Sequence, residues 1–304
     1  MAERGSADSA PIALRPAATV MLLRDHVEFG LQVLMVRRNL NSDFVGGAFV
    51  FPGGAVDPSD AGPAIERRSL GRSDADASAI LGLPTGGLAY WVAVLRECFE
   101  EAGILLARDA IGTMLSLDGP ADAERYAAHR QALNDRSTSF AAIAEEEDLH
   151  LDVAGVHYFA HWITPEGAPR RYDTRFFVAK APDGQTPAND QSETIADIWI
   201  TPAEALAAHR REEIEMVLPT IRNLQDLARF ERSADVLEAA AAAGSVPAIL
   251  PRISVTDRGV QILVPGDDGY DEAVPKHFAG GGGNFNEMAK AVSHHANPEP
   301  DANA

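Results

Sequence analysis

Three glutamates near the middle of the chain have a spacing that suits metal binding. Glu97, Glu100 and Glu101 stand at positions i, i+3 and i+4, which share one side of a helix because each residue turns the helix by about 100°. Carboxylates this close repel one another unless a positive charge lies among them. Hard divalent cations prefer oxygen ligands, so the triplet predicts a Mg²⁺ or Mn²⁺ site.

The same segment predicts an amphipathic helix that positions the triplet. The apolar residues on its other side are Trp91, Leu95, Cys98, Ala102 and Leu105. Such a stripe is typical of a helix packed on a core. Arg96 can pair with Glu100 one turn along and hold its carboxylate in place. A plain helix salt bridge is the alternative for Arg96. A solvated acidic face is the alternative for the glutamates, but the pattern Arg-Glu-x-x-Glu-Glu-x-Gly is rare by chance.

The residues around the triplet resemble the Nudix box, Gly-x5-Glu-x7-Arg-Glu-U-x-Glu-Glu-x-Gly-U, where U is apolar. Residues 96–104 match its second half in order, and Gly54 in Phe51-Pro-Gly-Gly54 matches its first glycine. Asp60 stands where the family has glutamate, but turn chemistry around Pro58 is the favoured interpretation of Asp60 and of Asp57. A segment of 35 residues, 61–95, replaces the short spacer before the arginine.

Two features are similar to the coenzyme A diphosphatase branch of this superfamily, typified by mammalian peroxisomal enzymes. One is the interruption of the box, and the other is the segment Ile262–Tyr270. The resemblance spans residues 17–272. It implies a Nudix α/β/α sandwich with a mixed sheet. It also implies metal-dependent hydrolysis of a phosphoanhydride, with coenzyme A or acyl-coenzyme A giving 3′,5′-ADP and (acyl-)4′-phosphopantetheine.

The resemblance also implies the residues of the site. The implied catalytic residues in the box are Arg96, Glu97, Glu100 and Glu101. The metal ligands are these three glutamates, with a backbone carbonyl in the Gly54 region. Family sites often add a carboxylate from a distant loop, and Glu193, before the Trp199 strand, holds the matching place. We expect Glu193 to bind metal or to act as general base, with a cap or surface carboxylate as the alternative.

Four arginines are candidates for binding the phosphates of the substrate, since arginine suits phosphate oxygens. They are Arg37, Arg38, Arg171 and Arg175. Strand alternation places Arg171, Asp173 and Arg175 on one sheet face, where they could equally form a structural ion pair. The apolar residues Ile80, Leu81, Leu83 and Leu88 are candidates for the wall of a pantetheine groove.

Other substrates and one other class of function stay open. A Nudix pyrophosphatase acting on ADP-ribose, NADH or capped RNA is the first alternative. The chain lacks a segment like Ser-Gln-Pro-Trp-Pro-Phe-Pro-x-Ser of the NADH group, and Pro120 is only a weak match to the marker proline of the ADP-ribose group. A non-catalytic ligand-binding module is the second alternative. Loss of box glutamates would indicate it, and all three are present.

Composition limits the partners and the compartment. The 304 residues carry a formal net charge of −19, which argues against a DNA-binding surface. No apolar run approaches the roughly 18 residues of a membrane span, and residues 1–16 contain no apolar segment typical of a secretory signal. The one cysteine, Cys98, fits a reducing cytoplasm. We expect a cytoplasmic enzyme for a small nucleoside diphosphate derivative, and a homodimer is left open.

The order of the predicted elements indicates an α/β or α+β fold. We expect flexible tails at 1–16 and 273–304 around a domain at 17–272, with insertions at about 61–87 and 108–150. Strands are predicted at 17–23, 31–37, 156–164, 172–181, 195–200, 252–256 and 260–264. Helices are predicted at 120–133, 137–147, 219–231 and 233–243, with Ser137 as the cap of the second. A further helix is predicted to begin with Thr201 as its N-cap and Pro202 as its first residue. The insertion at 61–87 is rich in glycine, which predicts a surface excursion.

Overall fold

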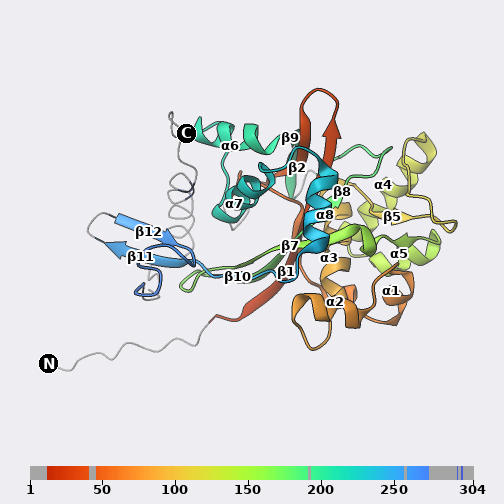
Figure 1. The fold of residues 1–304 in the computed structure, drawn as a ribbon. Helices are drawn as coiled ribbons and strands as arrows, with labels where there is room; N and C mark the ends of the chain where they lie inside the picture. The colour runs from red at the N-terminus through yellow and green to blue at the C-terminus, as the bar shows by residue number, and fades with distance from the viewer. Residues whose placement is uncertain are drawn as a thin grey trace.

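A mixed β-sheet runs through the centre of the protein (Figure 1). The computed structural model describes residues 12–40, 46–190, 193–256 and 259–273, with residues 293 and 296. The sheet strands are β1 (Leu14–His26), β2 (Gly30–Arg38), β3 (Phe49–Val50), β4 (Gly53–Ala55), β7 (Val156–Ile163), β8 (Arg171–Lys180), β9 (Thr194–Ile200) and β10 (Ala248–Ile249). Their order is β10-β7-β8-β1-β2-β3, and β4 also pairs with β1 and β9 with β2. β1 pairs with β8 in parallel and with β2 antiparallel, so the sheet is mixed.

Helices cover both faces of this sheet. They are α1 (Pro63–Arg68), α2 (Asp74–Leu81), α3 (Leu88–Ala102), α4 (Pro120–Asn134), α5 (Phe140–Glu146), α6 (Pro202–Arg210), α7 (Leu218–Leu227) and α8 (Ser233–Ala242). In β1, Val20 and Leu22 pack on one side with α3, whereas Met21 and Leu23 pack on the other with α6, α7 and α8. Strands buried on both faces are apolar throughout, which explains the continuous run in β1. The predicted α/β/α sandwich is confirmed.

Most predicted elements have the predicted type, and the differences lie at their ends. The strands at 156–164 and 172–181 form the antiparallel pair β7–β8. The hairpin near the end of the domain is β11 (Arg252–Thr256) with β12 (Gly259–Leu263), and β5 (Ala107–Arg108) pairs with β6 (His150–Leu151). Residues 14–16 belong to β1 rather than to the predicted tail, because they pair with β8. Of the predicted tail 273–304, only residues 273, 293 and 296 are described.

The insertion at 61–87 is more than a surface excursion. It folds into α1 and α2, and Ile65 and Ala77 are buried in the core beside α3. Apolar side chains from this glycine-rich segment therefore help to hold the helix that carries the glutamates.

The insertion also caps the first turn of α3. The Asp74 carboxylate accepts hydrogen bonds from the backbone N–H groups of Gly86 (3.0 Å) and Leu88 (3.0 Å). The Ser78 hydroxyl accepts one from Gly87 at 2.9 Å. Gly87 itself has no capping side chain, and a Cβ there would lie 2.3 Å from the Ser78 nitrogen. The first-turn N–H groups, which a helix cannot satisfy internally, thus find acceptors on α2.

The second insertion, at about 108–150, packs α4 against α3 and α5 against α1. Tyr126, Leu133, Phe140 and Ile143 are buried in the same core. The hydroxyl of Ser139 caps α5 by accepting from the N–H of Ala142, so the prediction of Ser137 as the cap was wrong. The predicted cap of α6 is confirmed, because the Thr201 side chain accepts from Glu204.

Within the residues that the structure describes, no helix combines the length and apolar character needed to cross a bilayer.

Candidate active site

Helix α3 presents the box glutamates at the edge of the sheet. Its predicted apolar stripe is fully buried, which fixes the rotation of the helix about its axis. The helix ends at Gly103, whose φ of 68° is a left-handed conformation that favours glycine. Gly103 and Ile104 donate backbone hydrogen bonds to Phe99 and Cys98 there. Burial also raises the pKa of the Cys98 thiol, so this cysteine is a packing residue.

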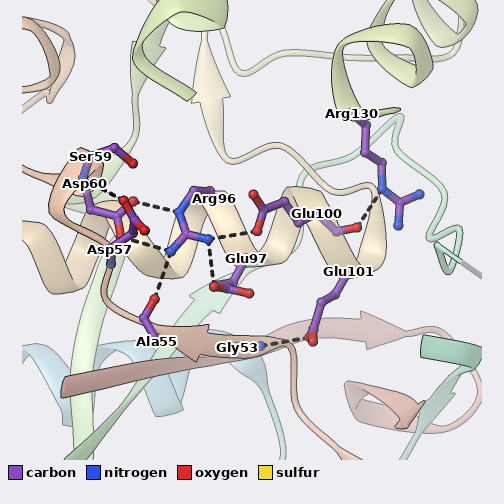
Figure 2. Close-up of polar contacts among 10 residues, drawn as sticks. All are labelled: Gly53, Ala55, Asp57, Ser59, Asp60, Arg96, Glu97, Glu100, Glu101 and Arg130. Carbon is purple, nitrogen blue, oxygen red and sulfur yellow. Dashed lines mark hydrogen bonds and ion pairs between the residues drawn. The ribbon is translucent and has the colours of Figure 1, made fainter. Parts of the chain in front are cut away.

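Arg96 is the centre of an ion-pair network that Figure 2 shows. Its guanidinium donates to both carboxylate oxygens of Asp60, at 2.7 and 2.9 Å. It also donates to Glu97 (2.7 Å) and to Glu100 (2.8 Å). The fifth N–H bonds the backbone carbonyl of Ala55 at 2.9 Å. All five donors of the guanidinium are therefore used, and the predicted Arg96–Glu100 pair is confirmed as one part of this network.

Asp60 was missed as a site residue by sequence reasoning, which assigned it to turn chemistry. It does both jobs. Its carboxylate accepts from the backbone N–H of Asp57 at 2.7 Å, closing a capping box in the 3₁₀ turn Pro58–Asp60. It also binds Arg96 with 1% of its surface exposed. The Asp at the family's Glu position thus connects the first half of the box to the second across the insertion.

The two glycines of β4 bring the backbone close to the glutamates. The N–H of Gly53 donates to the Glu101 carboxylate at 3.0 Å. A Cβ on Gly54 would lie 2.6–2.7 Å from the carboxylate atoms of Glu97. A glycine is therefore required at position 54 for Glu97 to occupy its place against the strand.

Crowding of negative charge perturbs all three box glutamates. Burial and the neighbouring Glu100 raise the pKa of Glu97 to about 7, although Arg96 acts in the opposite direction. Burial also raises the pKa of Glu100. Burial and the charge of Glu97 raise the pKa of Glu101 well above its usual range, against the Gly53 hydrogen bond and the charge of Arg38. The single positive charge of Arg96, which Glu97 and Glu100 share with Asp60, does not offset this crowding.

The donor set therefore suits a hard divalent ion, which favours the ionised form of carboxylates. Among the described residues, no three acidic, histidine or cysteine side chains converge into a complete metal cage. Glu97 and Glu100 are instead turned towards Arg96. Residues that could hold a metal are the box glutamates, Glu193 and the Gly54 backbone. Glu97 and Glu100 each bond Arg96 through one carboxylate oxygen, and the other oxygen is not used by Arg96.

Two cavities meet at the glutamates. The acidic cavity, of about 560 Å³, is lined by Gly54, Ala55, Asp57, Ser59, Arg96, Glu97, Glu100, Glu101, Leu133, Asn134, Arg136, Thr138, Ser139, Phe140, Asp190 and Glu193. The apolar cavity has a volume of about 320 Å³, and its wall includes Arg38, Phe51, Trp162, Tyr172, Phe176, Leu218 and Ile262. Gly54, Ala55, Glu101 and Glu193 line both.

Glu193 lies at this junction, in the place that the sequence predicted. Its negative charge contributes to the raised pKa values of Glu97, Glu100 and Glu101. The next residue, Thr194, donates its hydroxyl to the backbone carbonyl of Glu101 at 3.0 Å. The start of β9 is thereby tied to the end of α3.

The structure separates the four predicted phosphate-binding arginines. Arg38 lines the apolar cavity beside Glu101, and its Nε is buried without a hydrogen-bond partner among the described residues. Arg37 donates to the Gly47 carbonyl at 3.2 Å. Arg171 donates to the Thr164 carbonyl at 3.1 Å. These two and Arg175 line neither cavity in the described structure.

Arg175 takes the structural alternative, an ion pair within β8. Its guanidinium donates to Asp173 at 2.9 Å and lies 4.6 Å over the ring of Tyr90. Leu81 and Leu88 of the first insertion are core residues beside α3 and line neither cavity. The apolar cavity is walled instead by β7, β8 and the start of α7.

Two further arginines near the glutamates have no signature in the sequence. Arg130 on α4 donates to the backbone carbonyl of Glu100 at 2.9 Å, at the end of α3 (Figure 2). Arg136 lines the acidic cavity from the α4–α5 loop. Both come from the second insertion, and only the packing of that insertion on α3 places them here.

The fold and the arrangement of the box residues define a Nudix hydrolase. The chain belongs to the NUDT19 Nudix domain family, whose model matches residues 61–227, more than half of its length. It is an enzyme of that class rather than a non-catalytic ligand-binding module.

Relatives agree with this assignment. The chain is 29% identical over 279 residues to the acyl-coenzyme A diphosphatase NUDT19 of Homo sapiens, covering 80% of this chain and 73% of the relative. It is 29% identical to the protein of that name from Gallus gallus, over 79% of this chain and 73% of the relative. The crystal structure of a NUDIX hydrolase from Alicyclobacillus acidocaldarius has a TM-score of 0.61 and 28% identity, covering 78% of this chain and 99% of that one.

Proposed function

We propose that this protein hydrolyses the diphosphate of coenzyme A and of acyl-coenzyme A, releasing 3′,5′-ADP and (acyl-)4′-phosphopantetheine. The observation that carries the proposal is the junction of the two cavities at Glu101 and Glu193. Carboxylates suited to a metal-bound diphosphate lie there beside an apolar chamber. Coenzyme A thioesters have a diphosphate attached to a long, largely apolar arm, and relatives named acyl-coenzyme A diphosphatase support the assignment.

We propose Mg²⁺ or Mn²⁺ as the metal, held by Glu97, Glu100 and Glu101 with the Gly54 backbone. When bound, such an ion lowers the pKa of a coordinated water and neutralises charge on phosphate oxygens. The raised pKa values of the three box glutamates mark them as carboxylates whose ionisation would gain from a cation.

Three side chains supply the general base, the phosphate contact and the positioning of the glutamates. Glu193 accepts the proton of the attacking water as general base, from the loop side of the junction. Arg38, whose Nε finds no acceptor in the part of the chain that the structure describes, donates to phosphate oxygens from the apolar-cavity side. Arg96 holds Glu97 and Glu100 in position, because its five donors are already occupied by protein acceptors.

The apolar cavity would bury the acyl-pantetheine arm. Trp162, Phe176 and Leu218 contribute aromatic and aliphatic surface to it, and removing apolar surface from water contributes roughly 25 cal/mol per Å². ADP-ribose, NADH and capped RNA lack such an arm, so they would leave this chamber without an apolar occupant. A cytoplasmic location and a homodimer stay predictions.

Kinetics on a set of diphosphates tests the proposal. Free coenzyme A, a medium-chain acyl-coenzyme A, ADP-ribose, NADH and capped RNA are compared with Mg²⁺ and with Mn²⁺, and products are identified by mass. We expect the coenzyme A compounds to have the highest kcat/KM. As the contamination control, Glu101→Gln should lower the turnover of all of them by roughly 10²-fold. Cleavage of ADP-ribose or NADH at least as efficient as that of coenzyme A would show that the substrate assignment is wrong, leaving only the family.

A further inference from the structure

The loop between α4 and α5 forms one wall of the acidic cavity. The residues of the loop and its flanks that line the cavity are Leu133, Asn134, Arg136, Thr138, Ser139 and Phe140. The box glutamates line the same cavity from α3. The loop therefore contacts whatever part of a substrate extends from the metal site into this cavity.

Arg136 is the cation of this wall. Its side chain is exposed, and the described residues give its guanidinium no hydrogen bond or ion pair. Its φ of 57° lies in the left-handed region that residues other than glycine rarely adopt. Unusual backbone of this kind is often found where a side chain must point to a ligand. The positive charge of Arg136 also contributes to lowering the pKa of Asp57, which lines the cavity from another element.

The loop that carries Arg136 is held rigidly. The backbone N–H of Arg136 bonds the Leu133 carbonyl at 2.9 Å. Ser137 bonds the Ala132 carbonyl twice, through its backbone N–H at 2.9 Å and its hydroxyl at 3.0 Å. Ser139 then caps α5. A guanidinium on such a loop loses little conformational freedom of the backbone when it binds an anion.

The other arginine lining the acidic cavity in the described structure, Arg96, cannot serve the substrate in this way. All five of its N–H groups donate to protein acceptors (Figure 2). Arg136 is thus the cation left for an anionic group that enters this cavity beyond the metal ions. Thr138 and Asn134 add a hydroxyl and an amide to the same wall.

We propose that Arg136 binds the 3′-phosphate of the substrate, so that the nucleotide end lies in the acidic cavity and the pantetheine arm in the apolar cavity. This inference rests on the proposed function. The 3′-phosphate is a dianionic monoester separated from the diphosphate, and a charged guanidinium recognises it through paired hydrogen bonds. Arg38, in the apolar cavity, is close enough to Glu101 to serve the diphosphate instead.

The test compares coenzyme A with dephospho-coenzyme A, which lacks only the 3′-phosphate. For the unmodified protein, one lost charge-assisted contact predicts kcat/KM roughly tenfold to hundredfold higher for coenzyme A. Arg136→Gln should remove that preference with little change on dephospho-coenzyme A, and Arg136→Lys should restore part of it. The matched control, Arg229→Gln, removes a surface arginine that is 77% exposed and lines neither cavity, and it should keep the full preference.

Binding of product analogues gives a readout independent of turnover. By calorimetry, adenosine 3′,5′-bisphosphate should bind the unmodified protein more tightly than 5′-AMP, and Arg136→Gln should remove the difference. The inference would be overturned if Arg136→Gln kept the full preference for coenzyme A over dephospho-coenzyme A, or if Arg38→Gln lost that preference instead. Cleavage of coenzyme A by the unmodified protein would still support the proposed function in either case. No cleavage of coenzyme A by the unmodified protein would refute the proposed function itself.

Discussion

Replacing Asp60 by Asn tests whether the buried pair with Arg96 holds the two halves of the interrupted box together. Asp60 is 1% exposed and Arg96 is 8% exposed. Water therefore cannot replace the hydrogen bonds that either group loses when its partner is removed. Asn retains the size of Asp but removes the charge, and it places an N–H₂ group against a guanidinium donor. Arg96 is then left with Glu97, Glu100 and the Ala55 carbonyl.

The expected loss of stability is large. Removing one partner of a buried ion pair costs about 3–5 kcal/mol, because the other charge stays buried without compensation. Asp60 accepts two hydrogen bonds from Arg96 and one from Asp57. The amide oxygen of Asn can still accept a hydrogen bond. Glu97 and Glu100 still offset part of the positive charge of Arg96. We therefore expect about 3 kcal/mol, at the lower end of that range.

Urea denaturation of metal-free protein measures this loss, provided that the slope of the transition is unchanged. Asp235→Asn is the matched control, because Asp235 also pairs with an arginine, Arg232, but at the surface, where ion pairs contribute little. We expect Asn at position 60 to weaken Mn²⁺ binding as well, since the freed charge of Arg96 competes for Glu97 and Glu100. If Asp60→Asn destabilises the protein by no more than Asp235→Asn does, the pair does not hold the box together.

Four further outcomes are expected. Glu101→Gln and Glu100→Gln should each lower kcat by roughly 10²-fold, the loss of a main electrostatic stabiliser, and near-normal turnover at saturating Mg²⁺ would contradict metal binding by these residues. Glu193→Gln should lower kcat with little change in KM and flatten the acidic limb of the pH–rate profile, which an unchanged limb would refute. Gly54→Ala should remain folded by circular dichroism but lose activity, because its Cβ would lie 2.6–2.7 Å from the Glu97 carboxylate. The pKa of Glu97 is raised from 4.5 to about 7, so between these pH values the folded metal-free protein keeps a proton on Glu97 that the unfolded chain loses. The free energy of unfolding should therefore fall as pH rises from about 4.5 to 7, by up to about 3 kcal/mol. The difference in denaturation midpoint between metal-free and Mg²⁺-loaded protein should accordingly widen over that range.

Local periodicity in the sequence was enough to identify the box helix and its orientation. The spacing of Glu97, Glu100 and Glu101 and the apolar stripe behind them are properties of a single helix, so no other part of the chain is needed to predict them. The strands β7 and β8 and the Thr201 cap were also predicted from neighbouring residues alone. The family resemblance added Glu193, which lies about 90 residues from the helix and has no local pattern of its own.

Tertiary structure alone decided what surrounds the glutamates. The partners of Arg96 and Glu101 include Asp60 and Gly53, 36 and 48 residues away in the chain, and the caps of α3 come from the first insertion. Arg136 reaches the acidic cavity only because α4 packs on α3 and α5 packs on α1. Side chains brought together by packing leave no periodic pattern, because their separation in sequence is set by the length of the insertions rather than by the turn of a helix or the pleat of a strand. Helix geometry therefore determined which residues could bind a metal, and the packing of the insertions determined which charges and cavities lie next to it.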